Sequence, residues 1–430
     1  MANHELISGR IREMRRERGL SQAQLARPEL SDSYISLIES GNRAPTPAVL
    51  ELLAAKLGCT VSYLLNGITD DQVQDLEGDI RQARMALENG HAAQARRRFE
   101  ELLSNDAVGR FDMLRHQAEH GLALAAEACG DLDQAISILT RLRETARHSF
   151  PPERRIAIVI ALSRCHREMG DVEMAIEVAE QLMGEMIGGG WSDDLIELGA
   201  TLLVGYLARG DSLRAEHYTT ELLAAADALG TPRAVVAANW NAALNADAAG
   251  RGEEAIPLVE RALIVQSEIG DLRNLGRLRS DYALLLLRNR PGEAARSRDL
   301  LLKAEQELRE SSAGTVDHAY CMLNLAETEM TLGHVEQAAE HIRKAIDILS
   351  DSSPDTEMEA RLLLCRAYLQ LGRPQDAAVE AKAATELLDE LPATRINTEN
   401  WLTAASVLEE VGDHEESRRA YQRAMESGGV

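Results

Sequence analysis

The sequence predicts an all-α protein, with a small helix-turn-helix domain at the N-terminus and a long array of helix pairs after it. Two observations carry this prediction. Residues 21–41 have the pattern of two short helices joined by a tight turn. Farther along, a turn followed by a small residue recurs about every 40 residues, and a period of this kind indicates a solenoid of stacked repeats.

The segment 21–41 contains the start and stop signals of two helices. Ser21 is a natural N-cap for the first helix, and Pro28 ends it because proline cannot continue the hydrogen-bond ladder. Ser31 caps the second helix. Ile35 and Ile38 lie three residues apart and are expected to face inward, which leaves the polar residues of this helix outward. A helix-turn-helix presents its second helix to the major groove of DNA in this way.

The N-terminal residues, from about 6 to 65, resemble the lambda-repressor/Cro-like (XRE) DNA-binding domain. The stretches GRIREMRRERGLSQAQLA and LSDSYISLIESGNRAPTPAVLELLAAKLGCTVSYLL carry the resemblance. It implies a domain over residues 1–66 with five helices, near residues 5–18, 21–27, 31–40, 47–57 and 61–65. Arg15 and Glu39 match a pair that forms an internal salt bridge in such domains. Leu37 stands where many relatives carry a polar residue that reads a base.

The same resemblance implies a set of DNA contacts. A glutamine at the start of the first helix would contact phosphate, residues of the second helix would approach base edges, and the loop after it would hold the backbone. The residues of this candidate DNA-binding surface are Gln22, Ser31, Asp32, Ser33, Tyr34, Ser36, Asn42 and Arg43. Among them, Asp32 is chemically able to accept a hydrogen bond from cytosine N4.

The charge of the chain is strongly asymmetric. The whole chain has a formal net charge of −24, whereas residues 1–66 carry 8 Lys and Arg against 7 Asp and Glu. DNA contacts are therefore expected from this domain alone, with weak, salt-sensitive binding by a monomer and dependence on dimerisation.

Other site types lack their sequence signals. The five cysteines are scattered without metal-ligand spacing, and neither a glycine-rich phosphate loop nor a GxSxG or HExxH motif is present. We therefore expect no enzyme activity, no metal and no cofactor. No apolar run reaches the ~20 residues of a membrane span, so a cytoplasmic protein without membrane association is expected.

A stretch around residues 67–75 is predicted to link the first domain to a repeat array over residues 76–430. One position of the repeat is occupied by a small residue throughout, and its members are Ala95, Ala135, Ala175, Ala215, Ala255, Ala295, Ala338, Ala377 and Ser417. Each unit is expected to form two amphipathic helices around a glycine turn. The pattern resembles the tetratricopeptide (TPR) repeat, and it implies about nine helix pairs stacked into a right-handed superhelix.

An XRE domain followed by a TPR-like array resembles the RRNPP group of peptide-sensing quorum regulators. The resemblance implies a dimeric bacterial regulator that binds a partly palindromic operator and a short peptide on its concave surface. Asn241 and Asn324 each precede the small residue of their repeat by fourteen positions, and Arg164 and Arg366 precede theirs by eleven. The candidate effector-binding residues are Arg164, Arg167, Trp240, Asn241, Asn245, Tyr320, Asn324 and Arg366.

Two alternatives remain open from the sequence. The solenoid could dock a protein or a non-peptide metabolite in the same DNA-binding regulator. The whole chain could also be an interaction scaffold whose N-terminal domain has lost DNA binding, which Asp32 and the net acidity would tolerate.

Overall fold

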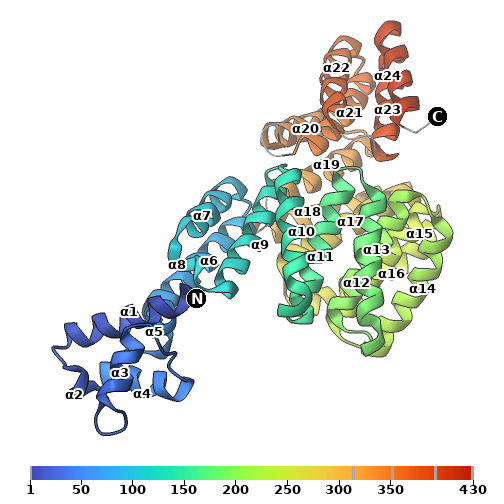
Figure 1. The fold of residues 1–430 in the computed structure, drawn as a ribbon. Helices are drawn as coiled ribbons and strands as arrows, with labels where there is room; N and C mark the ends of the chain where they lie inside the picture. Colours follow the sequence, from blue (N-terminus) through green and yellow to red (C-terminus); the bar gives the residue numbers. More distant parts are fainter. Residues whose placement is uncertain (1, 312, 314, 350–352, 392–394, 428–430) are drawn as a thin grey trace. The chain divides into compact units, whose positions relative to one another are not determined.

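The computed structural model describes residues 2–311, 313, 315–349, 353–391 and 395–427, and all regular structure in these ranges is helical. The N-terminal domain has the five predicted helices: α1 (Ala2–Glu17), α2 (Gln22–Ala26), α3 (Asp32–Glu39), α4 (Pro47–Leu57) and α5 (Val61–Asn66). Their apolar faces meet in one core, where Ile11, Leu25, Ile35, Leu53 and Leu64 are fully buried. The all-α prediction is confirmed (Figure 1).

The helix after this domain begins earlier than the sequence suggested. Thr69 and Gln72 form a capping box, in which the Gln72 amide donates to Thr69 Oγ1 over 3.3 Å and the Thr69 amide donates to Gln72 Oε1 over 3.0 Å. Helix α6 (Asp70–Glu88) therefore starts within the predicted linker, of which only residues 67–69 lie between helices. The chain divides into two compact units, residues 1–85 with 95–121 and residues 86–94 with 122–430.

Nine helix pairs follow the N-terminal domain in the described part of the chain, as the repeat predicted. They are α6 with α7 (Ala92–Ser104), α9 (Asp112–Ala128) with α10 (Leu132–Ser149), α11 (Pro152–Glu168) with α12 (Val172–Met186), α13 (Asp193–Arg209) with α14 (Ser212–Leu229), α15 (Pro232–Ala248) with α16 (Gly252–Ile269), α17 (Leu272–Asn289) with α18 (Ala294–Arg309), α19 (Thr315–Thr331) with α20 (Val335–Leu349), α21 (Pro354–Gln370) with α22 (Pro374–Glu390), and α23 (Arg395–Glu410) with α24 (His414–Ser427). A short helix α8 (Asp106–Gly109) and two 3₁₀ turns, η1 (Ile187–Gly189) and η2 (Pro291–Glu293), complete the set.

The small residue of the repeat lies in the packed interface of each pair, with one correction. The predicted positions are buried in the other repeats, but Ala295 is exposed. Ser297 is fully buried in its place, and Leu301, Ala304 and Leu308 continue the buried stripe from it. The turn η2 supplies the reason, because it adds residues between α17 and α18 and moves the register of α18 by two.

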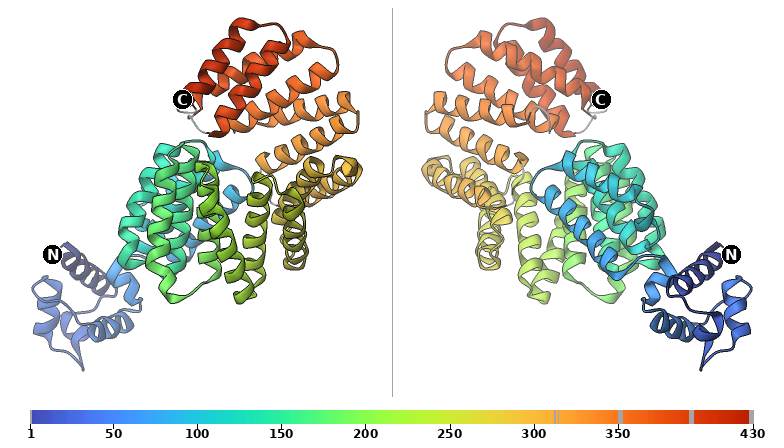
Figure 2. Two further views of the ribbon diagram at one scale, coloured as in Figure 1. Left: turned by 90° about the vertical axis from the view of Figure 1, so that its right-hand side faces the viewer. Right: turned by 90° about the vertical axis from the view of Figure 1, so that its left-hand side faces the viewer.

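The first helices of neighbouring pairs pack on one another from α11 to α15 and from α17 to α23, and α13 also contacts α23, ten α-helices later in the chain. The second unit therefore winds far enough to bring its late helices back to its early ones, as the two views of Figure 2 show. No helix in the described residues is long and apolar enough to cross a membrane.

Candidate DNA-binding and effector-binding surfaces

Two capped helices build the helix-turn-helix. Ser21 and Gln24 form a capping box at the start of α2, with Gln24 N donating to Ser21 Oγ over 3.1 Å and Ser21 N donating to Gln24 Oε1 over 2.8 Å. Ser31 accepts from the amide of Tyr34 over 3.2 Å and so caps α3. These bonds satisfy amide groups that a helix leaves unpaired at its start, and they fix where α3 begins.

A buried carboxylate holds the three N-terminal helices together. Glu39, on α3, is 3% exposed and accepts hydrogen bonds from Arg15 Nε over 2.6 Å and Arg15 Nη2 over 3.0 Å. Gln22, the first residue of α2, donates to the same carboxylate over 2.9 Å. Burial raises the pKa of Glu39, but the hydrogen bonds from Arg15 and Gln22 outweigh it and hold the pKa below its usual value. The group is therefore charged and paired at neutral pH.

The outward side of α3 is small and mostly hydroxylic. Ser33, Ser36, Leu37 and Ser40 fall within about one third of the helix circumference and are exposed, whereas Ile35 on the opposite side is buried. We call these four exposed residues the outer face of α3. Its only apolar side chain is Leu37, which is 41% exposed.

The predicted DNA-contacting residues surround this face. Ser31 and Asp32 are exposed at its start, and Asn42 and Arg43 are exposed beyond its end. The Arg43 guanidinium lies 4.8 Å from the centre of the Tyr34 ring, and Asn42 Nδ2 donates to Ser40 Oγ over 2.9 Å. Gln22 lies nearby, and its side-chain Nε2 donates a hydrogen bond to Glu39.

A row of polar residues follows the first helices of four successive pairs. Its members are Thr201 on α13, Asn241 on α15, Asp281 on α17 and Asn324 on α19, and we call them the inner row. Each is partly exposed, each follows a buried residue by three positions, and each precedes another buried residue by two, so the four positions are structurally equivalent. The prediction had included two of them.

The middle of the inner row is tied together by side-chain contacts. Trp240 Nε1 donates to Asp281 Oδ2 over 2.8 Å, and Arg277 lies 5.8 Å from the centre of the Trp240 ring. Asn324 Nδ2 donates to Ser280 Oγ over 3.0 Å, while Asn241 Nδ2 donates to the backbone of its own helix. Among the described residues, none donates a hydrogen bond to the side-chain carbonyl oxygen of Asn241 or Asn324.

Asp281 is the ionisable member of the row. Burial raises its pKa to about 6, against the opposing effects of the Trp240 hydrogen bond and the charges of Arg277 and Arg288. Its Oδ2 accepts the indole N–H of Trp240, and the positive charges of Arg277 and Arg288 act on the same carboxylate. The inner row thus offers both donors and acceptors along its length.

Charged residues of α11 lie opposite those of α21. Glu168 on α11 is near enough to Asp355 on α21 to interact with its charge, and Tyr320 on α19 interacts with both. The winding of the second unit therefore brings α11 and α21 near one another, although they lie far apart in the chain. Burial and neighbouring carboxylates raise the pKa of Glu168 to about 7, and they do the same for Glu359.

The other predicted effector residues are placed as follows. Arg164 forms a two-bond pair with Glu127, with Nη2 donating over 2.6 Å, and burial lowers the pKa of its neighbour Arg167. Tyr320 is 42% exposed and contacts Thr356 through its hydroxyl over 3.3 Å. Arg366 is exposed and lies 3.8 Å from Glu327.

Asn245 is placed differently from the rest. It is 3% exposed, and its Nδ2 donates to Thr219 Oγ1 on α14 over 3.0 Å. One turn beyond Asn241, it is rotated out of the inner row into the interface between α15 and α14. We therefore leave Asn245 out of the candidate effector surface.

Sequence reasoning missed Asp281, Glu168 and Glu359. Asp281 stands fourteen residues before Ala295, the same spacing that selected Asn241 and Asn324, so the signal was present. Asp281 shares the repeat position of Asn241 and Asn324 but differs from them in residue type. Glu168 and Glu359 carried no such signal, because their proximity depends on how far the superhelix turns.

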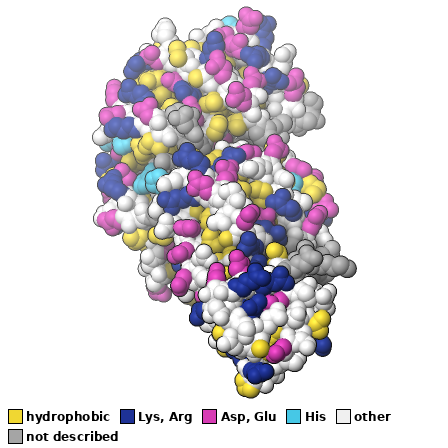
Figure 3. Space-filling view, turned by 60° about the vertical axis from the view of Figure 1, so that its left-hand side comes forward, with side chains coloured by type: hydrophobic (Ala, Val, Ile, Leu, Met, Phe, Trp, Pro, Cys, Tyr) yellow, Lys and Arg dark blue, Asp and Glu magenta, His cyan; other side chains and the backbone are white. Residues whose placement is uncertain are grey.

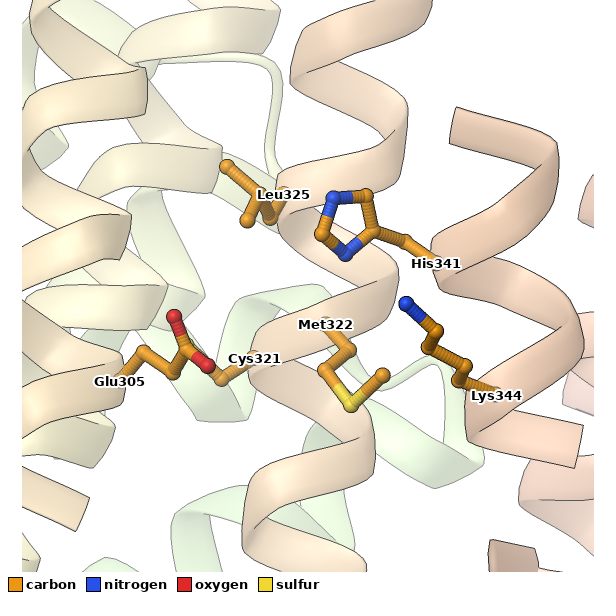
Figure 4. A pocket seen from close by; sticks show the side chains of 6 residues that line it. All are labelled: Glu305, Cys321, Met322, Leu325, His341 and Lys344. Carbon is orange, nitrogen blue, oxygen red and sulfur yellow. The ribbon is translucent and has the colours of Figure 1, made fainter. Parts of the chain in front are cut away.

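A separate pocket of about 130 Å³ lies between α18, α19 and α20. Cys321, Met322 and Leu325 of α19 line it together with Glu305 from α18 and two basic residues of α20, His341 and Lys344 (Figure 4). Burial raises the pKa of the Cys321 thiol to about 12, so this sulfur is not a thiolate at neutral pH. On the face shown in Figure 3, acidic and basic side chains are interspersed, and some Lys and Arg side chains gather in its lower part.

Comparison with known proteins supports both parts of the architecture. Residues 11–64 match the family described as Helix-turn-helix. No curated protein matches the chain. A solved structure of a Rap protein complexed with Competence and Sporulation Factor is 12% identical, covers 83% of this chain and 98% of its own, and has a TM-score of 0.53. It shows a shared fold.

Two further solved structures are similar over most of the chain. NprR in complex with its cognate peptide NprX is 14% identical, with 83% of this chain and 100% of that chain covered and a TM-score of 0.49. PlcR from Bacillus thuringiensis, in complex with the peptide PapR7 and DNA, is 18% identical, with 74% and 97% covered and a TM-score of 0.37.

Proposed function

We propose, from the helix-turn-helix domain at residues 11–64, that this chain is a sequence-specific DNA-binding transcription regulator whose solenoid binds a short peptide. The peptide would alter the affinity for an operator. The outer face of α3 carries the first half of this proposal, and the inner row carries the second.

The shape and chemistry of α3 support major-groove binding. The Ser31 cap fixes the start of the helix. Its end is fixed by the hydrogen bonds that Glu39 accepts from Arg15 and Gln22, which we call the Glu39 clamp, so its outer face is rigid. Small serine side chains let the helix backbone approach base edges, and hydroxyls both donate and accept. Exposed Asn42 and Arg43 beyond the helix are placed to hold phosphate groups.

The inner row supports a peptide as ligand. Adjacent packed helices lie about 9 Å apart and an extended chain rises ~3.3 Å per residue, so four helices span about eight peptide residues. Asn side chains with unused carbonyl oxygens pair with peptide amide groups. The Rap protein, which shares this fold, is complexed with a factor in its solved structure. A small metabolite would instead need an enclosed pocket within one or two repeats.

Dimerisation is part of the proposal. Because residues 1–66 carry almost no net charge, one copy neutralises few phosphates and binds weakly. Two copies on a partly palindromic operator would double the contacts, as helix-turn-helix dimers do. The effector would act on the spacing of the two N-terminal domains, since small rotations between repeats add up along a solenoid.

The DNA-binding half is tested by genomic footprinting of the tagged full-length chain. We expect discrete occupied sites that disappear in a Tyr34→Ala/Ser36→Ala double variant. In vitro, affinity for such a site should fall steeply with salt, as phosphate contacts require. Absence of localised occupancy under several growth conditions would favour the interaction scaffold.

The effector half is tested with a synthetic library of octapeptides, screened for any member that changes the affinity for an occupied site. Asn241→Ala and Asn324→Ala should abolish the response to that peptide and leave DNA binding without peptide intact. Gln306→Ala is the matched control, because it removes an exposed amide from the outer helix α18. A full response in both inner-row variants would contradict peptide binding at this surface.

A further inference from the structure

The outer face of α3 has one side chain that differs in chemistry from all its neighbours. Ser33, Ser36 and Ser40 present hydroxyls, whereas Leu37 presents a branched apolar group between them. Leu37 is 41% exposed, although Ile35 and Ile38 on the same helix are fully buried. The core of the domain is therefore filled without Leu37.

The position of Leu37 is fixed by the backbone around it. Its carbonyl oxygen accepts from the amides of Asn42 over 3.0 Å and Arg43 over 3.2 Å, and Ser40 Oγ donates to it over 3.1 Å. These bonds tie the end of α3 to the loop that carries the candidate phosphate contacts. The loop that carries Asn42 and Arg43 is therefore fixed relative to the backbone of Leu37.

The outer face also lacks the side chains that most often read guanine. Neither lysine nor arginine lies on α3, whose only charged residues are the exposed Asp32 and the buried Glu39. Arg or Lys bound to guanine O6 and N7 is the commonest specific contact in the major groove. Serine hydroxyls accept and donate, so they separate the four base pairs poorly. Apart from Asp32 at the start of the helix, discrimination by α3 must therefore come from another kind of contact.

We propose that Leu37 reads the C5-methyl group of thymine and is the main specificity-determining residue of α3. Of the four base pairs, only those with thymine place an apolar group in the major groove. Leu37 is the only apolar side chain on the outer face that can meet it. This inference rests on the proposed DNA binding and adds the base that the protein selects.

The size of the effect follows from the area of one methyl group. Removing a buried methyl weakens binding about fourfold, so a dimer that meets one methyl in each half-site would lose about fifteenfold. The loss should be independent of salt, because no charge changes.

The test changes one methyl group on the DNA and leaves the protein intact. Full-length protein is first used to select bound duplexes from a randomised pool. Each thymine in the selected sequence is then replaced, one at a time, by uracil, which keeps every hydrogen-bonding group and lacks only the methyl. We expect at least one thymine per half-site where uracil weakens binding about fourfold. Binding unaffected by uracil at every position would overturn the proposal.

Protein variants connect that thymine to Leu37. Leu37→Ala should bind the thymine and uracil duplexes equally well, and Leu37→Gln should select a different base at that position. Leu6→Ala is the matched control, because it truncates an exposed leucine on α1, away from the outer face. It should keep the wild-type preference for thymine.

The outcomes distinguish a failure of this proposal from a failure of the proposed DNA binding on which it rests. If no sequence is enriched from the pool, DNA recognition itself is wrong, and the role of Leu37 falls with it. If a sequence is enriched but Leu37→Ala still distinguishes thymine from uracil, only the assignment to Leu37 is wrong. If Leu37→Ala instead changes the molecular mass in solution, the side chain serves contact with a second copy, and the proposal is also overturned.

Discussion

At the residue scale, Glu39 determines whether the DNA-binding surface exists as a rigid unit. Its carboxylate joins α1 through Arg15 and α2 through Gln22, so three helices depend on one buried charge. Removing one partner of a buried pair leaves the other charge desolvated and unpaired, which costs about 3 kcal/mol.

We expect Glu39→Gln to destabilise the N-terminal domain by about this amount. The measurement is hydrogen exchange of residues 6–65 in the full chain, followed by mass spectrometry. Glu29→Gln is the control, since that carboxylate pairs with Lys56 at the surface and should matter little. Unchanged protection in Glu39→Gln would show that the clamp does not stabilise the domain.

The pH dependence of the clamp has a defined sign. Because the folded-state pKa of Glu39 is lowered, its stabilisation is present above the ordinary carboxyl pKa and is lost as pH falls through the folded-state value. Exchange protection of residues 6–65 should therefore decline below about pH 4.5 in the wild-type chain. The decline should be smaller in Glu39→Gln, which has no proton to gain there.

At the element scale, eight of the nine described helix pairs have a glycine with positive φ between their helices. Gly250 has φ +74° and nothing within 4 Å of the place where a Cβ would be, so only its backbone conformation requires glycine. Gly184 also has open space around it but has a helical conformation, in the last turn of α12. The two positions have equal space for a side chain but different backbone conformations, left-handed at Gly250 and helical at Gly184.

We predict opposite signs for one substitution at these two positions. Gly250→Ala should destabilise the solenoid by about 1 kcal/mol, because an L-residue is strained in the left-handed region. Gly184→Ala should stabilise it by about 1 kcal/mol, because alanine favours the helix. Urea unfolding followed by circular dichroism measures both, and equal signs would refute the backbone explanation.

The elements themselves were largely predictable from the sequence, because start and stop signals are local. Ser21, Ser31 and the recurring glycines act on their own helices, and the predicted helix pairs followed. The exception at Ala295 arose from η2, whose two extra residues shift the register without leaving a periodic signal. The inner row was half predicted, since Thr201 and Asp281 share the position of Asn241 but not its residue type.

At the scale of the whole molecule, the winding of the second unit brings acidic residues of α11 and α21 near one another. Glu168 on α11 meets Asp355 on α21, and Glu359 lies beside Asp355. The groups around Glu168 also include Glu127, Arg164 and Arg167, and Arg288 acts on Glu359. No local pattern predicts this arrangement, because it depends on the summed rotation of many repeats.

These raised pKa values predict that the solenoid is less stable at higher pH. A carboxyl group whose pKa rises to about 7 on folding binds its proton more tightly in the folded state than in the unfolded state. The free energy of unfolding therefore decreases as the pH rises from about 4.5 to 7. Glu168→Gln and Glu359→Gln should raise the melting temperature at pH 8 and leave it unchanged at pH 4. Circular dichroism melts at both pH values test this. An equal shift at both would attribute the effect to packing.

The contact between α13 and α23 has a consequence for cooperativity. In an open repeat array each unit depends only on its neighbours, so the terminal repeats can unfold one after another. Here a helix of the last pair also rests against a helix of the fourth pair. Loss of the C-terminal repeats therefore removes support from the middle of the array, and the second unit should melt in fewer, larger steps than a linear chain of repeats.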